Sequence, residues 1–216
     1  MRFGLLQIGL GVALVAFAFF GGGVFWALAW PGVSVFVVGA AYLSEWPGVF
    51  GKSPSTGALS WLPIVMLLPY FAVAWTLWQL KSRLSNEAPF DEVAPGILVG
   101  RRAIDASEAP EDVAVVVDLT SEFRRSPHYP GRHVTRPTLD TRPPSELGAL
   151  VEALADETGP ILFHCAMGHG RSATAAAALM IHRGLAPDVD AAVTQMKAAR
   201  PGVHLHRAQR EAVRRL

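Results

Sequence analysis

The chain has 216 residues, of which 51% are hydrophobic and only 17% are charged, and its formal net charge is +1. No long basic run is present, which excludes the proteins that hold nucleic acid through a basic face. The single cysteine excludes an intrachain disulfide framework and suits a reducing compartment. Residues 1–80 contain only three charged side chains, Arg2, Glu45 and Lys52, so the chain divides into an apolar first part and an ordinary second part.

The first part, residues 1–81, is predicted to be an α-helical transmembrane region. No charged residue occurs from Phe3 to Ser44, and about 20 apolar residues suffice for one span. We expect spans near 4–21 and 24–43 and a third near 60–80. Lys81 and Arg83 follow the last apolar run, and by the positive-inside bias they place the C-terminal domain in the cytoplasm. The chain is thus expected to be a multi-pass membrane protein, of a bacterial inner membrane.

Other interpretations of this region stay open. A re-entrant or interfacial piece in place of one span would leave two spans in all. A signal peptide over residues 1–18 is less consistent with the sequence, because the apolar run continues through the candidate cleavage site. A soluble helical bundle would carry charged faces, and this region has none.

The second part begins with a predicted linker, residues 82–95, and continues as a soluble domain over 96–216. The apolar, β-branched segments predict strands, and capping residues together with helical periodicity predict helices. We expect Ser145 and Asp188 to begin two of the helices and Gly184 to end one. Strands are predicted at 96–100, 113–119, 133–137 and 161–165, and helices at 146–157, 173–183, 189–199 and about 205–216.

The chemistry is concentrated after the last predicted strand, where His164-Cys165 is followed by five residues and then Arg171-Ser172. A helix N-terminus stabilises a thiolate at a strand end. A loop with Gly168 and Gly170 can turn its backbone N–H groups inward as an anion site. The planar guanidinium of Arg171 matches two phosphate oxygens. This arrangement predicts a nucleophilic cysteine below a bound phosphate group.

The motif His-Cys-x5-Arg-Ser resembles the signature loop of the cysteine-dependent protein tyrosine phosphatase superfamily, in its dual-specificity branch. The resemblance covers about residues 95–216 and implies an α/β fold: a central sheet flanked by helices, here preceded by the transmembrane region. Rhodanese-like and arsenate-reductase-like proteins are the nearest competitors. The implied phosphate-binding residues are Ala166, Met167, Gly168, His169, Gly170 and Arg171.

The same resemblance implies roles for the remaining site residues. In the family an aspartate on a preceding loop is the general acid, and Asp140, which lies 25 residues before Cys165, matches this place. Ser172 is expected to hydrogen-bond the sulfur and His164 to hold the loop and favour the thiolate. Asp118 is expected to be structural, and His204 and His206 to be exposed helix residues. Neither a metal nor another cofactor is required.

The sequence therefore predicts a membrane-anchored phosphomonoesterase that acts through a phospho-cysteine intermediate. Its partners would be the lipid bilayer and a phosphorylated protein; alternatively, the substrate is the head group of a phospholipid. A non-catalytic phosphate-binding module is a further alternative, which the intact Cys165, Arg171 and Asp140 disfavour. A sulfurtransferase would need no acid at Asp140.

Overall fold

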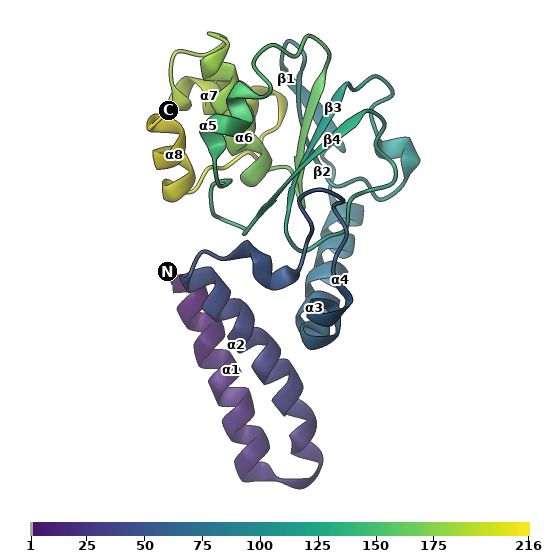
Figure 1. Cartoon of the computed structure of the whole chain (residues 1–216), viewed down its shortest axis with the longest axis vertical. Helices are drawn as coiled ribbons and strands as arrows, with labels where there is room; N and C mark the ends of the chain where they lie inside the picture. The colour runs from purple at the N-terminus through teal and green to yellow at the C-terminus, as the bar shows by residue number, and fades with distance from the viewer. Residues whose placement is uncertain (1) are drawn as a thin grey trace.

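The computed structural model describes residues 2–216 and contains a helical N-terminal region joined to an α/β domain (Figure 1). The two long N-terminal helices lie side by side and extend away from the sheet. The start of the first helix and the end of the second are the helix ends nearest to the α/β domain, and the turn between the two helices is farthest from it. The N-terminal elements are α1 (Arg2–Gly21), η1 (Gly23–Leu28), α2 (Ala29–Leu43), η2 (Pro47–Phe50), α3 (Trp61–Met66) and α4 (Leu68–Leu84).

Small residues bring α1 and α2 into close contact. A Cβ atom added to Gly11 would lie 2.7 Å from the carbonyl oxygen of Gly32, and one added to Gly39 would lie 2.8 Å from the Ile8 nitrogen. Small residues at such crossings let helix backbones approach closely, as is typical of helices packed in a membrane. The α1–α2 pair is therefore a helical hairpin held by backbone proximity.

Two segments of this hairpin are long and apolar enough to cross a membrane. Phe3–Gly21 has a mean hydropathy of 2.2 and is only 17% buried, and Gly23–Leu43 has a mean hydropathy of 1.8 and is 28% buried. A core helix of a soluble protein would be mostly buried. These segments instead expose apolar side chains, as helices do when they associate with a membrane.

The expected third span near 60–80 is not one continuous helix in the structure. It is broken at Leu67 into α3 and α4, because Pro69, which cannot donate a backbone hydrogen bond, begins the second helix. Two tryptophans of α4 donate hydrogen bonds to the α/β domain, Trp75 to the Glu122 carbonyl (2.9 Å) and Trp78 to the Ala166 carbonyl (3.0 Å). The structure thus contains two segments long and apolar enough to cross a membrane, whereas residues 61–84 form two shorter helices.

The α/β domain contains a five-stranded sheet in the order β1-β2-β5-β3-β4, in which only β1 is antiparallel to its neighbour. Residues of β3 and β5 alternate between the two faces, as the pleat requires. Val117 and Phe163 pack under the helices, whereas Val116 and Leu162 pack under loops on the other face. The strands are β1 (Phe90–Ala94), β2 (Ile97–Arg101), β3 (Val115–Thr120), β4 (Arg132–Thr138) and β5 (Ile161–Cys165).

Four helices cover one face of this sheet (Figure 1). As predicted, Asp188 caps α7 by accepting hydrogen bonds from the amides of Asp190 and Ala191, and Gly184 has a positive φ just after α6. The helices are α5 (Leu147–Glu152), α6 (Arg171–His182), α7 (Val189–Ala199) and α8 (Arg207–Arg214). A short 3-10 helix, η3 (Ala106–Glu108), lies between β2 and β3 in the chain.

Two boundaries differ from the sequence prediction. The helix predicted over 146–157 is only α5, and Glu146, with φ of 52°, takes the capping position in place of Ser145. The predicted linker 82–95 includes strand β1, and Arg200 binds its Asp91 side chain at 2.7 Å. This segment is therefore part of the domain, because its strand pairs with β2.

The N-terminal region docks on the edge where the parallel strands end. Lys52, in the connection between α2 and α3, donates hydrogen bonds to Asp118 (2.6 Å) and to the Thr120 carbonyl (2.7 Å) at the end of β3. Gly57 accepts a backbone hydrogen bond from Arg125. Ligands of open α/β sheets bind at this carboxyl edge, so the membrane-like helices lie beside the expected site.

Candidate active site

Cys165 is the last residue of the central strand β5, and the loop 166–170 leads from it directly into α6. Its sulfur accepts a hydrogen bond from the Gly168 amide at 3.3 Å and lies 3.4 Å from the Ser172 hydroxyl. The side chain is 3% exposed. The structure therefore brings Cys165, the loop and Ser172 together as the sequence predicted.

The loop needs glycine at position 168. Gly168 has φ of 78°, and a Cβ atom there would lie 2.5 Å from the carbonyl carbon of Gly100 in β2. A larger residue would therefore combine backbone strain with a clash against the neighbouring strand.

Arg200 holds the loop through hydrogen bonds, a role that the sequence analysis did not identify. Its buried guanidinium donates to the carbonyls of Gly168 (3.0 Å) and Met167 (3.1 Å), and also to Ala88 and Asp91. Carbonyls held in this way face away from the anion site, which leaves the loop amides to face it.

Arg171 is the first residue of α6 and is almost completely buried. Its Nη1 and Nη2 bind the two oxygens of Glu122 at 2.9 and 2.7 Å, and Nη1 also donates to the Thr138 carbonyl at 3.0 Å. The Nε on the other edge of the guanidinium makes no hydrogen bond among residues 2–216, and the Asp140 carboxylate lies 3.4 Å from it. A planar edge with two donors matches two oxygens of a phosphate group.

Glu122 is a site residue that the sequence analysis missed. Burial alone would raise the pKa of this carboxyl, but the Arg171 guanidinium lowers it below its ordinary value, so Glu122 is a carboxylate. Glu122 in turn raises the pKa of Arg171 well above its ordinary value despite the burial of the guanidinium. The pair fixes the charge and orientation of the arginine.

Asp140 lies on the loop after β4, and its exposed carboxylate is 3.4 Å from the Arg171 Nε. A cavity of about 240 Å³ is lined by Asp140, Cys165 and Arg171 together. The structure therefore brings the predicted acid into the same cavity as the predicted nucleophile.

The Asp140 loop is held by the N-terminal region. Leu139 packs into an apolar cluster with residues of α2, η2 and α4. Arg142 forms an ion pair with Glu45 at 2.8 Å and donates to the Tyr42 carbonyl at 3.3 Å. The position of Asp140 consequently depends on contacts with the end of α2.

His164 differs from its expected role. It is completely buried, and neither ring nitrogen has a hydrogen-bond partner among residues 2–216. Burial lowers its pKa to about 4, so the ring is neutral near pH 7. His164 packs against the Tyr129 ring, with centroids 4.9 Å apart, and does not hold the loop through hydrogen bonds.

Three other histidines surround the mouth of the cavity. His169 pairs with Glu87 at 2.5 Å, while His204 and His206 line the cavity from the segment before α8. Both are exposed, as expected, but they lie just before α8 rather than within a helix, and His206 is its N-cap. No three His, Cys, Asp or Glu side chains are arranged to hold a metal ion in the described part of the chain.

A second cleft, of about 200 Å³, shares Asp140, Ala166, Met167 and Arg171 with the catalytic cavity. Its other wall comes from the N-terminal region and includes Tyr42, Phe50, Tyr70 and Trp78. The site thus opens on one side toward the histidines and on the other toward the apolar helices.

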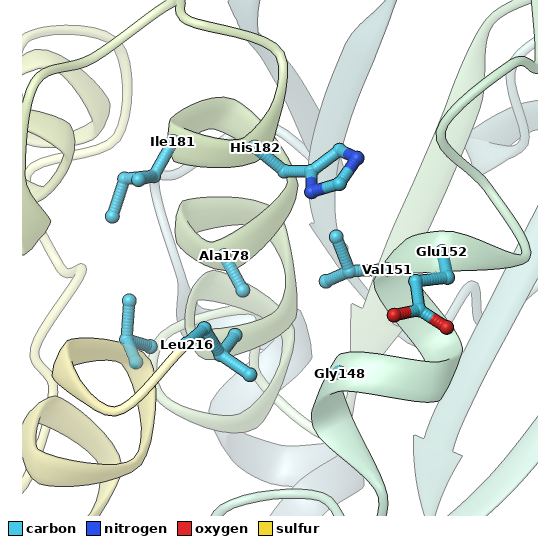
Figure 2. Close-up of a pocket in the computed structure, with 8 residues that line it drawn as sticks. Gly148, Val151, Glu152, Ala178, Ile181, His182 and Leu216 are labelled. Atoms are coloured by element: carbon cyan, nitrogen blue, oxygen red, sulfur yellow. The ribbon is translucent and has the colours of Figure 1, made fainter.

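A separate pocket of about 150 Å³ lies between α5, α6 and the C-terminal end of the chain (Figure 2). Val151 and Ala178 line it, with Glu152 and His182 at its rim. It shares no residue with the catalytic cavity and contains neither a cysteine nor an arginine. This pocket is therefore separate from the candidate active site at the carboxyl edge of the sheet.

Comparison with known proteins agrees with this geometry. Residues 113–214 match the family model described as PTP-SAK, Swiss Army Knife protein, DSP-PTPase phosphatase domain. No curated protein sequence matches the chain.

Several solved structures are similar to the chain. A mouse putative dual specificity phosphatase complexed with zinc tungstate is 22% identical, covering 61% of this chain and 87% of that chain with a TM-score of 0.47. Human DUSP28 is 24% identical, covering 59% and 91% with a TM-score of 0.46. PTPMT1 in complex with PI(5)P is 17% identical, covering 59% and 93% with a TM-score of 0.49.

The matched segment contains Cys165 and the loop 166–170, Glu122, Asp140 and the helices α5 to α8. Residues 113–214 of this chain therefore form a domain of the dual-specificity phosphatase type, as the matching family model describes it.

Proposed function

We propose that the chain hydrolyses phosphate monoesters with Cys165 as the nucleophile. The observation that carries this proposal is the Nε edge of Arg171, fixed by Glu122, in one cavity with the Cys165 sulfur and Asp140. A phosphate group bound there by Arg171 and the loop amides lies over the sulfur, where these donors stabilise the charge of the transition state.

The reaction then has two displacements at phosphorus. The Cys165 thiolate forms an S–P bond while the bond to the ester oxygen breaks, and Asp140 gives its proton to that oxygen. Water attacks the phospho-cysteine, Asp140 takes a proton from it, and the S–P bond breaks to release phosphate. Ser172, 3.4 Å from the sulfur, donates a hydrogen bond to the leaving thiolate.

We also propose that α1 and α2 cross a membrane as a hairpin and that the catalytic domain lies on the cytoplasmic side. Both helices expose large apolar side chains, and Lys81 and Arg83 occupy the last turn of α4 beside the domain. Recovery of the full chain in the soluble fraction without detergent would contradict this arrangement.

The enzymatic test is phosphate release by the full chain in lipid nanodiscs, with Cys165→Ser as the blank. We expect turnover by the wild type, none by Cys165→Ser, and retained binding of inorganic phosphate by that variant. Asp140→Asn is expected to slow substrates with poor leaving groups most. Phosphate binding by the wild type without any turnover would instead favour a non-catalytic binding module.

A further inference from the structure

The cleft between the catalytic loop and the N-terminal region has two chemically different ends. One end contains Arg171, Glu122 and Asp140, which are the charged groups of the phosphate site. The other end is formed by aromatic and aliphatic side chains of α2, η2 and α4, namely Tyr42, Phe50, Tyr70, Ala74, Leu77 and Trp78. A ligand that fills the whole cleft therefore has a phosphate group next to an apolar body.

Two indole N–H groups at this wall or behind it already donate hydrogen bonds within the protein. Trp78 donates its indole N–H to the Ala166 carbonyl, and Trp75 behind it donates to the Glu122 carbonyl. A peptide in the cleft would need partners for its backbone N–H and C=O groups, whereas a hydrocarbon chain needs none. The chemistry of the wall favours a hydrocarbon chain.

The wall is also continuous with the surface that faces a membrane. Phe3, at the start of α1, and Tyr42, near the end of α2, both line the cleft, and their rings contact each other with centroids 4.9 Å apart. The side chains of α1 and α2 beyond this point include many exposed apolar groups. A chain that leaves a bilayer beside these helices can enter the cleft without crossing water.

Lys81 adds a cation to this wall, one turn beyond Trp78. A cation at the end of a helix, next to interfacial tryptophans, lies where lipid phosphates gather at a membrane surface. Its position agrees with an anionic head group approaching along α4.

We propose that this cleft binds the hydrocarbon chain of a phosphorylated lipid, whose terminal phosphate monoester is thereby placed on the loop 166–170. This inference rests on the proposed phosphatase function and specifies its substrate class. The N-terminal helices are then part of the substrate site as well as an anchor.

The test compares alkyl phosphates of increasing length. Full-length protein in phosphatidylcholine nanodiscs is assayed for phosphate release from n-butyl, n-octyl and n-dodecyl phosphate, from p-nitrophenyl phosphate and from a phosphotyrosine peptide. Because each buried methylene adds to binding, we expect kcat/KM to rise at least about 10-fold from butyl to dodecyl phosphate.

A matched pair of variants separates binding in the cleft from simple partition into the bilayer. Ala74 lines the cleft, whereas Ala72 is an exposed residue of the same helix outside it. Ala74→Trp is expected to remove most of the dependence on chain length, and Ala72→Trp to keep it. Leu77→Asn against Leu80→Asn repeats the comparison at positions that are 49% and 53% exposed, where folding is not at risk.

The results of these assays separate a failure of the lipid proposal from a failure of the phosphatase function. Turnover of p-nitrophenyl phosphate with equal kcat/KM for all chain lengths would overturn the lipid proposal and leave the mechanism intact. A dependence on length that Ala74→Trp and Leu77→Asn both retain would also overturn it, as would a phosphopeptide that exceeds dodecyl phosphate. No release from any substrate, as in Cys165→Ser, would overturn the phosphatase function itself.

Discussion

At the scale of single residues, the phosphate site depends on how Arg171 is held. Glu122 occupies one edge of the guanidinium and leaves the other for substrate. Without this carboxylate the arginine would keep its charge but would be held only by the hydrogen bonds of Nη1 to backbone carbonyls. Positioning of this kind contributes to catalysis without any direct contact between Glu122 and the reacting atoms.

We expect Glu122→Gln to lower kcat/KM about 100-fold, since a displacement of about 1 Å at a catalytic group has an effect of that size. The measurement is steady-state hydrolysis of p-nitrophenyl phosphate, together with the affinity for inorganic phosphate, which should also fall. Glu111→Gln, at an exposed position, is the control. Unchanged phosphate affinity in Glu122→Gln would show that the pair does not orient the arginine.

The burial of His164 leads to a second prediction, which concerns how the free energy of unfolding depends on pH. Its pKa falls from 6.5 to about 4 because burial disfavours the charged ring. The folded state therefore resists protonation, so the stability that neutral His164 contributes is complete above the unfolded pKa and is lost as pH falls from about 6.5 to about 4.

The expected loss is on the order of 3 kcal/mol in the free energy of unfolding across that interval. It is measured by urea denaturation of the full chain in detergent between pH 7 and pH 4. His164→Gln should remove most of this pH dependence, whereas His182→Gln, on the far side of α6 in the separate pocket, should keep it. Equal slopes in all three proteins would contradict the assignment to His164.

At the scale of elements, sequence and structure agree where the signal is local. The strand, loop and helix around Cys165 follow from residues within a dozen positions of one another, and so does the cap of α7. Glu122 and Arg171 are 49 positions apart, and Lys52 and Asp118 are 66 apart. No periodicity or capping rule connects such pairs, so the partners of the site residues emerge only from the folded sheet.

The loop after β4 shows the consequence of such long-range contacts. The sequence analysis located Asp140 on this loop, but it did not identify the contacts that hold the loop in place. Leu139 packs against apolar residues of the N-terminal region, and Arg142 pairs with Glu45 and donates a hydrogen bond to the Tyr42 carbonyl. The N-terminal helices therefore hold the loop of the proposed general acid through a few contacts at the end of α2.

Arg142→Ala is expected to displace Asp140 and so to resemble a weakened Asp140→Asn. We expect a several-fold decrease in kcat for an alkyl phosphate and a smaller one for p-nitrophenyl phosphate, whose leaving group needs little help from an acid. Arg132→Ala, at the opposite end of β4 and 58% exposed, is the matched control. Equal decreases on both substrates would mean that Arg142 acts on binding rather than on proton transfer.

At the scale of the whole molecule, the membrane-like helices and the phosphatase domain share a buried ionic contact. Lys52 and Asp118 are both completely buried at the side chain and lie 2.6 Å apart. Burial raises the pKa of Asp118, but His164 and Lys52 outweigh it and bring the value to about 2, so the carboxylate stays charged. The connection between α2 and α3 thus completes the charge balance beneath the catalytic strand.

Removing one partner of a buried ion pair leaves an uncompensated charge, so Lys52→Met should destabilise the full chain by about 3–5 kcal/mol. Lys197→Met, at an exposed position of α7, should have almost no effect. Lys52→Met combined with Asp118→Asn should recover part of the loss, because the second change removes the unpaired charge. The free energy of unfolding of each variant is measured by denaturant unfolding, with tryptophan fluorescence, to which Trp75 and Trp78 of α4 contribute, as the signal. If Lys52→Met unfolds like the wild type, the two regions are not coupled through this contact; a large loss makes the helices and the phosphatase domain one cooperative unit.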